Sequence, residues 1–193
     1  GNINLKQTKA TLSKFSFPIP LYHQQNKYGM AGAILTIPDE ALEEPNLIVS
    51  GNDTVDQELI EDIYQQMTNA DQNIDALIVG KQMNEYFPGG YLKTDSEGFL
   101  SQFVEKPAPG TQPSDLVNIV YHYHKKPLKF KQAITSYLSN NQDAQDGYQT
   151  AFQNLVDTGY MVRVHRFNGS WQAIKFPSHA IAKSQILVEK TGG

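Results

Sequence analysis

The stretch Gly90–Pro107, GYLKTDSEGFLSQFVEKP, is the most informative part of this 193-residue sequence. Residues 90–94 and 99–105 form two runs of strand-forming character, and the polar segment 95–98 between them is typical of a tight turn. The stretch therefore predicts a β-hairpin. The polar pair Glu105-Lys106 lies where the second strand ends, which is a common position for ligand-binding residues.

Upstream of the hairpin, short apolar runs alternate with amphipathic segments. The patterns predict an edge strand at 17–23, a short helix at 30–36, strands at 46–50 and 76–79, and a helix at 55–67. The run that ends at Gly51 is typical of a buried parallel strand. Asp53 or Thr54 is expected to cap the helix that follows.

Downstream of the hairpin, the chain mixes strands with helices. The patterns predict a strand at 116–124, helices at 128–139 and 148–157, a second hairpin from 160–167 and 171–176 with its turn at Asn168-Gly169, and a last helix at 178–189 capped by Ser178. The whole order predicts one α/β domain, residues 1–193, with a mixed sheet. Its ligand site is expected beyond the carboxyl ends of the parallel strands, near Gly51.

Composition excludes several classes of protein. Hydrophobic residues make up 39% of the chain and charged residues 19%, which is enough apolar material for a packed core. The net charge of -4 and the lack of a basic stripe argue against a nucleic-acid partner. No apolar run approaches the length of a membrane span. There is no cysteine, so disulfide and thiolate sites are excluded, and we expect a cytoplasmic location.

The hairpin resembles that of the sugar-phosphate nucleotidyltransferases, the glucose-1-phosphate thymidylyl- and uridylyltransferases. Their pattern Tyr-Gly-Val-Val, Asp-Gly, Phe-Val-Glu-Lys-Pro matches here with equal spacing from Gly90 to Gly98 and from Gly98 to Glu105. The resemblance implies that Gly90, Glu105 and Lys106 bind a hexose 1-phosphate, the glutamate through sugar hydroxyls and the lysine through phosphate. The family's tyrosine is replaced by Gly89.

Gln24 with the run that starts at Gly29, GMAGAI, resembles the family's nucleotide-binding segment. The resemblance implies that the Gln24 side chain and the Gly29 backbone bind the base of a nucleoside triphosphate or nucleotide sugar. A glutamine amide offers both a donor and an acceptor to a base edge, and glycine lets the backbone approach closely.

Two further segments resemble the family's metal site, with substitutions. In the run SGND, residues 50–53, Asn52 stands where the family has its first magnesium-binding aspartate, and Asp53 follows one residue later. In Trp171–Pro177, Ala173 stands where the family has the second aspartate. The resemblance implies Mg²⁺ as the cofactor of an intact parent, with Asp53 as the remaining candidate ligand. The alternative is that Asp53 only caps a helix.

The resemblance implies a Rossmann-like nucleotide-diphospho-sugar transferase fold, truncated at its N-terminus. The family's Gly-x-Gly-Thr-Arg triphosphate loop has no match in these residues. We therefore expect a nucleotidyltransferase domain whose isolated fragment is inactive and assign no catalytic residue. The alternative is a degenerate homologue that binds sugar nucleotides without catalysis. Missing first strands would leave a sheet edge open, and an edge of that kind favours self-association into a homo-oligomer.

His122 and His124 have alternate positions on the strand predicted at 116–124, so they share one face. Two imidazoles so placed can bind zinc, but no third ligand is evident in the neighbouring sequence. The favoured interpretation is a half-exposed structural strand.

Overall fold

The strand β6 (Leu116–His124) is the centre of a six-stranded sheet in the computed structural model, which describes residues 5–25, 27–68, 73–141, 144 and 147–174. One edge of β6 pairs antiparallel with β3 (Ala76–Gln82). Its other edge pairs antiparallel with β4 (Gly90–Thr94) and with β1 (Asn46–Val49). The outer strands are β5 (Leu100–Glu105), beside β4, and β7 (Val162–Phe167), beside β3.

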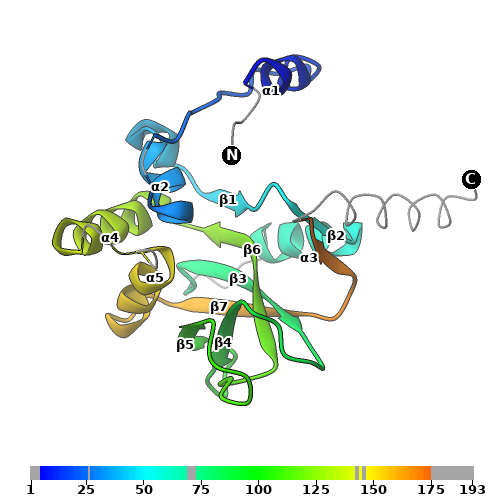
Figure 1. The fold of residues 1–193 in the computed structure, drawn as a ribbon, viewed down its shortest axis with the longest axis vertical. Coiled ribbons are helices and arrows are strands. Elements are labelled where there is room, and N and C mark those ends of the chain that lie inside the picture. Colours follow the sequence, from blue (N-terminus) through cyan, green and yellow to red (C-terminus); the bar gives the residue numbers. More distant parts are fainter. Residues whose placement is uncertain (1–4, 26, 69–72, 142–143, 145–146, 175–193) are drawn as a thin grey trace, which may run out of the picture.

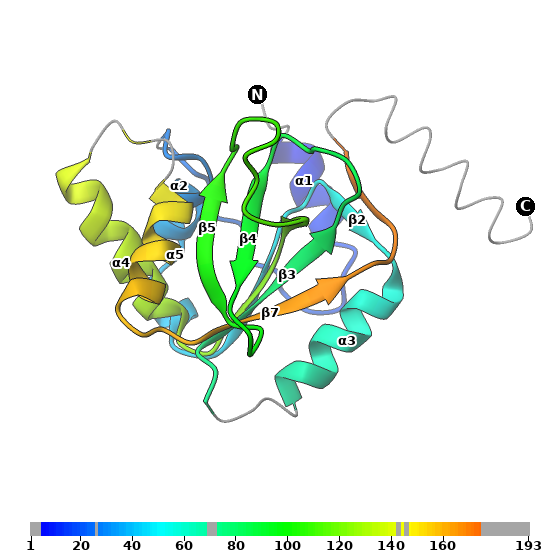
Figure 2. The same cartoon turned by 90° about the horizontal axis from the view of Figure 1, so that it is seen from below.

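Helices cover both faces of this sheet (Figures 1 and 2). On one face lie α2 (Gly29–Thr36), α4 (Pro127–Asn140) and α5 (Gly147–Asp157), and on the other lies α3 (Gln57–Thr68). Strand β3 contributes to both cores because its side chains alternate: Ala76 and Ile78 pack towards α4 and α5, whereas Leu77 and Val79 pack towards α3. The fold is therefore a three-layer α/β sandwich, and the predicted α/β class with a mixed sheet is confirmed.

A separate two-stranded ribbon lies beside the sheet, formed by β2 (Asp53–Val55) and β8 (Trp171–Ala173). The second hairpin predicted for residues 160–176 is therefore wrong. Strand β7 instead pairs parallel with β3, whose residues 76–80 are all buried, and β8 pairs antiparallel with β2. Both faces of β7 carry buried side chains, Val162 and Val164 on one and Phe167 on the other, and they gain more from this covered position than from a solvent-exposed hairpin.

The hairpin of β4 and β5, the strand β6 and the helices α2, α3, α4 and α5 are confirmed within two residues at each end. Three other local predictions are wrong. Residues 17–23 form no strand, because two prolines in seven residues remove ladder donors. The strand β1 runs antiparallel to β6 and is only half-buried. Asp53 and Thr54 lie in β2, and α3 starts after Asp56, whose carbonyl accepts from the Leu59 N–H.

The N-terminal helix α1 (Leu5–Leu12) stands apart from the sandwich (Figure 1). The chain then passes Phe15 and Phe17, which are exposed, and reaches α2. A 3-10 helix, Asp39–Leu42, links α2 to β1. Among the described helices, none combines the length and the apolar character that crossing a membrane requires. The helix predicted at 178–189 lies outside the described residues.

Candidate sugar-phosphate site

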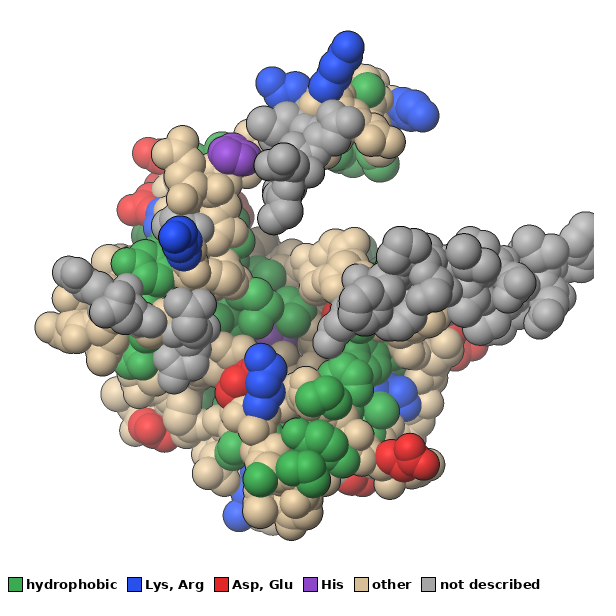
Figure 3. All heavy atoms as spheres, viewed as in Figure 1, with side chains coloured by type: hydrophobic (Ala, Val, Ile, Leu, Met, Phe, Trp, Pro, Cys, Tyr) green, Lys and Arg blue, Asp and Glu red, His purple; other side chains and the backbone are tan. Residues whose placement is uncertain are grey.

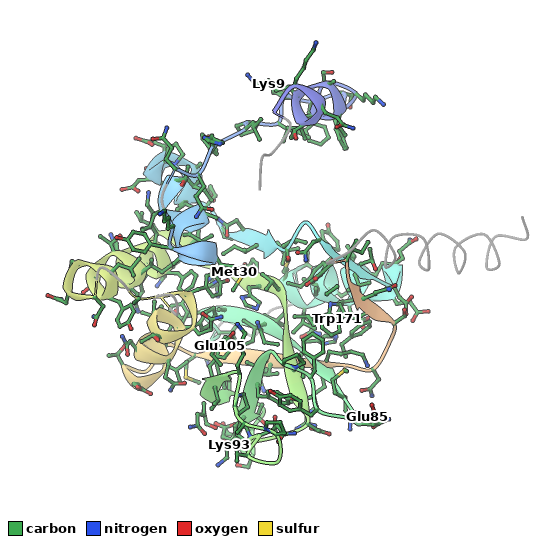
Figure 4. All side chains as sticks on the ribbon, viewed as in Figure 1. Lys9, Met30, Glu85, Lys93, Glu105 and Trp171 are labelled. Atoms are coloured by element: carbon green, nitrogen blue, oxygen red, sulfur yellow. The ribbon has the colours of Figure 1, made fainter. Side chains whose placement is uncertain are left out.

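A pocket of about 240 Å³ lies where the hairpin, the ribbon and the start of α2 meet. Its lining comprises Met30, Ser50, Asn52, Asp53, Phe87, Pro88, Gly89, Gly90, Glu105, Lys106, Asn118, Val120, Gln149, Trp171 and Ala173. Figure 3 shows a basic and an acidic side chain together near the middle of this face, with hydrophobic side chains around them. In Figure 4, Met30, Glu105 and Trp171 lie around the same region from α2, β5 and β8. The structure thus gathers residues from six of the predicted segments.

The sugar-phosphate residues predicted from the sequence lie together in this pocket. Gly90 is the direct partner of Glu105 in the hairpin, and the Lys106 N–H donates to the Gly89 carbonyl at 3.1 Å. Gly90 has no room for a side chain. A Cβ there would lie 2.5 Å from Cε2 of Phe103 and 3.0 Å from Oε2 of Glu105. The glycine therefore lets an aromatic ring and a carboxylate occupy the space above the hairpin.

The Glu105 carboxylate is held from two sides. Gln149 Nε2 donates to Oε2 at 3.0 Å, and Lys106 Nζ lies 3.5 Å from Oε1. The Lys106 side chain is 68% exposed, so its ammonium can turn to an anion in the pocket. Lys106 has a φ of 44°, the only positive φ among the described residues other than glycine. This left-handed backbone costs about 1 kcal/mol for a residue with a Cβ, and such strain is commonly found at ligand sites.

The two positions that match the family's metal aspartates are also adjacent. Asp53 pairs with Ala173 across the ribbon, and the Asn52 carbonyl accepts from the Ile174 N–H at 2.7 Å. The Asn52 side-chain oxygen already accepts from the Ser50 hydroxyl at 2.5 Å. Among the described residues, no three His, Cys, Asp or Glu side chains form a metal cluster. Asp53 suits an Mg²⁺ ion whose other ligands are water and substrate phosphates. It does not suit an ion held by the protein alone.

The nucleotide-binding residues predicted from the sequence contact each other, but they do not line the pocket. Gln24 Nε2 donates to the Gly29 carbonyl at 3.0 Å. Gly29 has a φ of 55°, which glycine adopts without strain, and it starts the helix that brings Met30 to the pocket rim. Gly29 thus precedes a pocket residue in the chain, and this hydrogen bond holds Gln24 beside Gly29.

Gln149 and Asn118 were missed as site residues by the sequence reasoning. Gln149 is on the first turn of α5, 44 positions from its partner Glu105, and no local pattern could reveal that pairing. Asn118 lies within a segment that matched the family, but it was assigned no role there. A sequence signal that could have identified both is a polar residue that directly follows a residue expected in the core. Asn118 follows Val117 and Gln149 follows Tyr148, and both of these neighbours are buried.

His122 and His124 are fully buried, so the prediction of a half-exposed strand is wrong. They face the core under α4 and α5. Burial lowers the pKa of each ring to about 3, and His124 adds a smaller lowering effect on His122. His122 contacts the Tyr148 hydroxyl through Nδ1 at 2.7 Å and Asn118 Oδ1 through Nε2 at 2.8 Å. His124 stacks on Phe130 at 4.6 Å, and its nitrogens have no hydrogen-bond partner within the described part of the chain.

Comparison with known protein families identifies the family of this chain. Residues 2–174 match the nucleotidyl transferase family, a match that covers most of the sequence. The chain belongs to the nucleotidyl transferase family. The hairpin sequence resembled that of the sugar-phosphate members of this family, and that resemblance is confirmed. No curated protein has a matching sequence.

Solved structures share the fold of this nucleotidyl transferase chain. An apo UDP-glucose pyrophosphorylase superposes with a TM-score of 0.65 at 17% identity, over 87% of this chain and 63% of its own. A UDP-glucose pyrophosphorylase complexed with UDP-glucose gives 0.63 at 19% identity, over 86% and 64%. A Bacillus anthracis protein assigned as a glucose-1-phosphate thymidylyltransferase, in complex with sucrose, gives 0.66 at 13%, over 84% and 62%. The chain therefore spans a little under two thirds of these relatives.

Proposed function

We propose that this chain carries the sugar-phosphate side of a sugar nucleotidyltransferase site. In that reaction an oxygen of a hexose 1-phosphate attacks the α-phosphorus of a nucleoside triphosphate in line. A nucleotide sugar forms and pyrophosphate leaves. The observation that carries the proposal is that Gly90, Glu105 and Lys106 share one pocket with Asp53. Acceptors for sugar hydroxyls and a cation for phosphate thus lie in the same pocket as the Asp53 carboxylate, the candidate ligand for a metal ion.

The pocket residues act by binding and orientation. Glu105 Oε2 accepts from Gln149, which fixes the carboxylate so that Oε1 remains available to accept from sugar hydroxyls. Lys106 is within reach of that oxygen and of bulk solvent, and an ammonium is a natural partner for phosphate. An Mg²⁺ ion beside Asp53 would neutralise charge on the phosphates. Gln24 and Gly29 would place the base on the α2 side of the pocket.

Changing Lys106 to alanine should weaken the binding of glucose 1-phosphate by about ten- to thirtyfold, because a charge-assisted bond to phosphate is lost. Titration calorimetry with glucose 1-phosphate and with UDP-glucose measures the effect. Lys93→Ala is the matched control, since Lys93 is an exposed lysine on the same hairpin, away from the pocket (Figure 4). Equal affinities for Lys106→Ala and Lys93→Ala would remove Lys106 from the site.

A second candidate function is sugar-nucleotide binding without catalysis. The specific observation in its favour is that Asn52 and Ala173 line the pocket at the positions where the family has metal-binding aspartates. A single carboxylate leaves an Mg²⁺ ion held mainly by water and substrate. The sequence also contains no match to the family's Gly-rich triphosphate loop.

This 193-residue chain should therefore release no measurable pyrophosphate from UTP or dTTP with glucose 1-phosphate and Mg²⁺. Without a group that orients the leaving pyrophosphate, misplacement of about 1 Å already costs roughly a hundredfold in rate. A coupled pyrophosphate assay on highly purified protein measures this. Turnover that follows the protein through successive purification steps would exclude the non-catalytic candidate and show that this chain is an enzyme as it stands.

A further inference from the structure

A line of three polar side chains leads from the pocket into the core. Asn118 lines the pocket, His122 lies behind it, and Tyr148 on α5 lies behind His122. Both His122 and Tyr148 are fully buried among aromatic rings, with Phe152 edge-on to the imidazole at 5.6 Å. Buried polar groups of this kind cost free energy unless each is hydrogen-bonded. Both His122 and Tyr148 are hydrogen-bonded, and their contacts connect the core to Asn118 at the pocket.

The donors and acceptors along this line give one consistent set of hydrogen bonds, besides a contact of the His122 ring with the Ile119 backbone. The Tyr148 hydroxyl is buried, and His122 Nδ1 is the only acceptor that the described residues offer it. The hydroxyl therefore donates to Nδ1, which must be unprotonated. The imidazole is neutral, because burial lowers its pKa to about 3, so its proton is on Nε2. Nε2–H then donates to Asn118, and the Asn118 atom facing it must be the carbonyl oxygen, as observed.

The backbone of β6 is deformed at this point. Residues 118 and 122 of a regular strand would be about 13 Å apart, too far for their side chains to meet. The pairing with β3 shifts between Ile78, opposite His122, and Val79, opposite Ile119. Strand β6 thus contains extra residues here, and the bulge brings Asn118 within 2.8 Å of the imidazole. Bulges that re-aim a side chain are common beside ligand sites.

Once the Asn118 oxygen is turned to His122, the amide nitrogen is left on the pocket side. Within the described part of the chain, no residue accepts a hydrogen bond from Asn118 Nδ2. We propose that His122 and Tyr148 are positioning residues that hold Asn118 with its amide N–H donors facing the pocket, ready to donate to a hydroxyl or phosphate oxygen of a sugar phosphate. The ligand part of this inference rests on the proposed function. Asn118 would supply a neutral donor to a pocket in which Glu105 supplies the acceptor.

The first turn of α5 supports both Asn118 and Glu105 in the pocket. Tyr148 directs Asn118 through His122, and the next residue, Gln149, binds the Glu105 carboxylate. Gly147 precedes them and packs tightly, since a Cβ there would lie 3.0 Å from Cδ2 of Leu138 and 3.4 Å from Cβ of Ala31. The first turn of α5 is therefore fixed against both α4 and α2, as a supporting element for ligand groups needs to be.

The test compares Tyr148→Phe with Tyr160→Phe. Tyr160 is also buried, and its hydroxyl donates to the Asp75 carbonyl at 3.3 Å, away from the pocket. In the ligand-free protein, ¹⁵N NMR of the His122 ring should show the Nε2–H tautomer in wild type and in Tyr160→Phe. With glucose 1-phosphate as the probe, Tyr148→Phe should bind about three- to tenfold more weakly, because Asn118 can then turn over, whereas Tyr160→Phe should bind like wild type. Asn118→Asp should lose more, since it has no N–H donor.

An Nδ1–H tautomer in wild type would overturn the inference, and so would equal affinities for Tyr148→Phe and Tyr160→Phe. His124→Phe gives a second control on the same strand face, because His124 makes no hydrogen bond within the described residues, and its affinity for the probe should match wild type. If wild type shows the Nε2–H tautomer but binds no glucose 1-phosphate, the orientation of Asn118 stands. The proposed function and the ligand role of Asn118 then fail.

Discussion

Replacing Gly90 with alanine should lower the free energy of unfolding by about 3 kcal/mol, at the upper end of overpacking costs. The new Cβ would lie 2.5 Å from Cε2 of Phe103 and 3.3 Å from its Cζ. Phe103 is buried and its ring packs on Phe152 at 6.2 Å, so the ring cannot swing aside without disturbing the core under α5. The Glu105 carboxylate, 3.0 Å from the same Cβ, would be displaced as well. Stability and ligand affinity should therefore fall together.

Urea denaturation measures the stability change of Gly90→Ala, which should appear as a lower midpoint with an unchanged slope. Gly51→Ala is the matched control, because a Cβ at Gly51 meets no atom within 4 Å and Gly51 does not have a positive φ. That change should alter stability by less than about 0.5 kcal/mol. If the two variants had the same midpoint, the close packing of Phe103 over Gly90 would not be the reason for a glycine there.

Changing both Asn52 and Ala173 to aspartate should strengthen the binding of Mn²⁺ or Mg²⁺ beyond what Asp53 alone offers. The new Asp at 173 would face Asp53 directly across the ribbon, with Cβ atoms about 4.5–5.5 Å apart. Without metal, the like charges should destabilise the protein by up to about 1 kcal/mol. Each added carboxylate should tighten Mn²⁺ binding by about tenfold, so about a hundredfold is expected for both.

Thermal unfolding with and without Mn²⁺ detects this change. At a Mn²⁺ concentration about a hundred times its dissociation constant, binding adds about 2.7 kcal/mol of stability. The control places two aspartates at Thr54 and Gln172, the neighbouring pair on the opposite face of the ribbon. This control adds the same number of carboxylates but lacks the third one, Asp53, on its face, so it should gain much less stability from Mn²⁺. A double variant at Asn52 and Ala173 that also ignores Mn²⁺ would show that these positions do not form the metal site.

The parts of the fold that could be predicted from the sequence are those whose contacts are local. The hairpin of β4 and β5 contains both of its strands and its turn within a single short stretch, and the Asp95 carboxylate accepts from the N–H groups of Glu97 and Phe99 at 2.9 Å. Strand β6 was also predicted at its observed bounds, because its β-branched and aromatic residues leave little choice. Glu105 and Lys106 could be placed at the end of the hairpin because they end such a local unit.

The parts that could not be predicted depend on distant partners. The run that forms β1 is compatible with either strand direction, and its antiparallel pairing is set by β6. Strands β7 and β8 are separated only by a short turn, yet they pair with β3 and β2. The alternation in Tyr121–His124 suggested one exposed face. Both faces are buried instead, since the tyrosines pack towards α3 and the histidines towards α4 and α5.

The pocket has a hairpin side and a ribbon side, and the chain entropy lost when each of them forms differs greatly. Its hairpin side is held by contacts such as that of the Ser101 hydroxyl with the Lys93 carbonyl, only 8 positions apart. Its ribbon side is held by contacts such as that of the Thr54 hydroxyl with the Gln172 carbonyl, 118 positions apart. Bringing together the ends of the longer loop costs about 2 kcal/mol more chain entropy, by the logarithmic scaling of loop closure. We therefore expect the segments at Asn52 and Ala173 to come together only after most of the chain between them has folded.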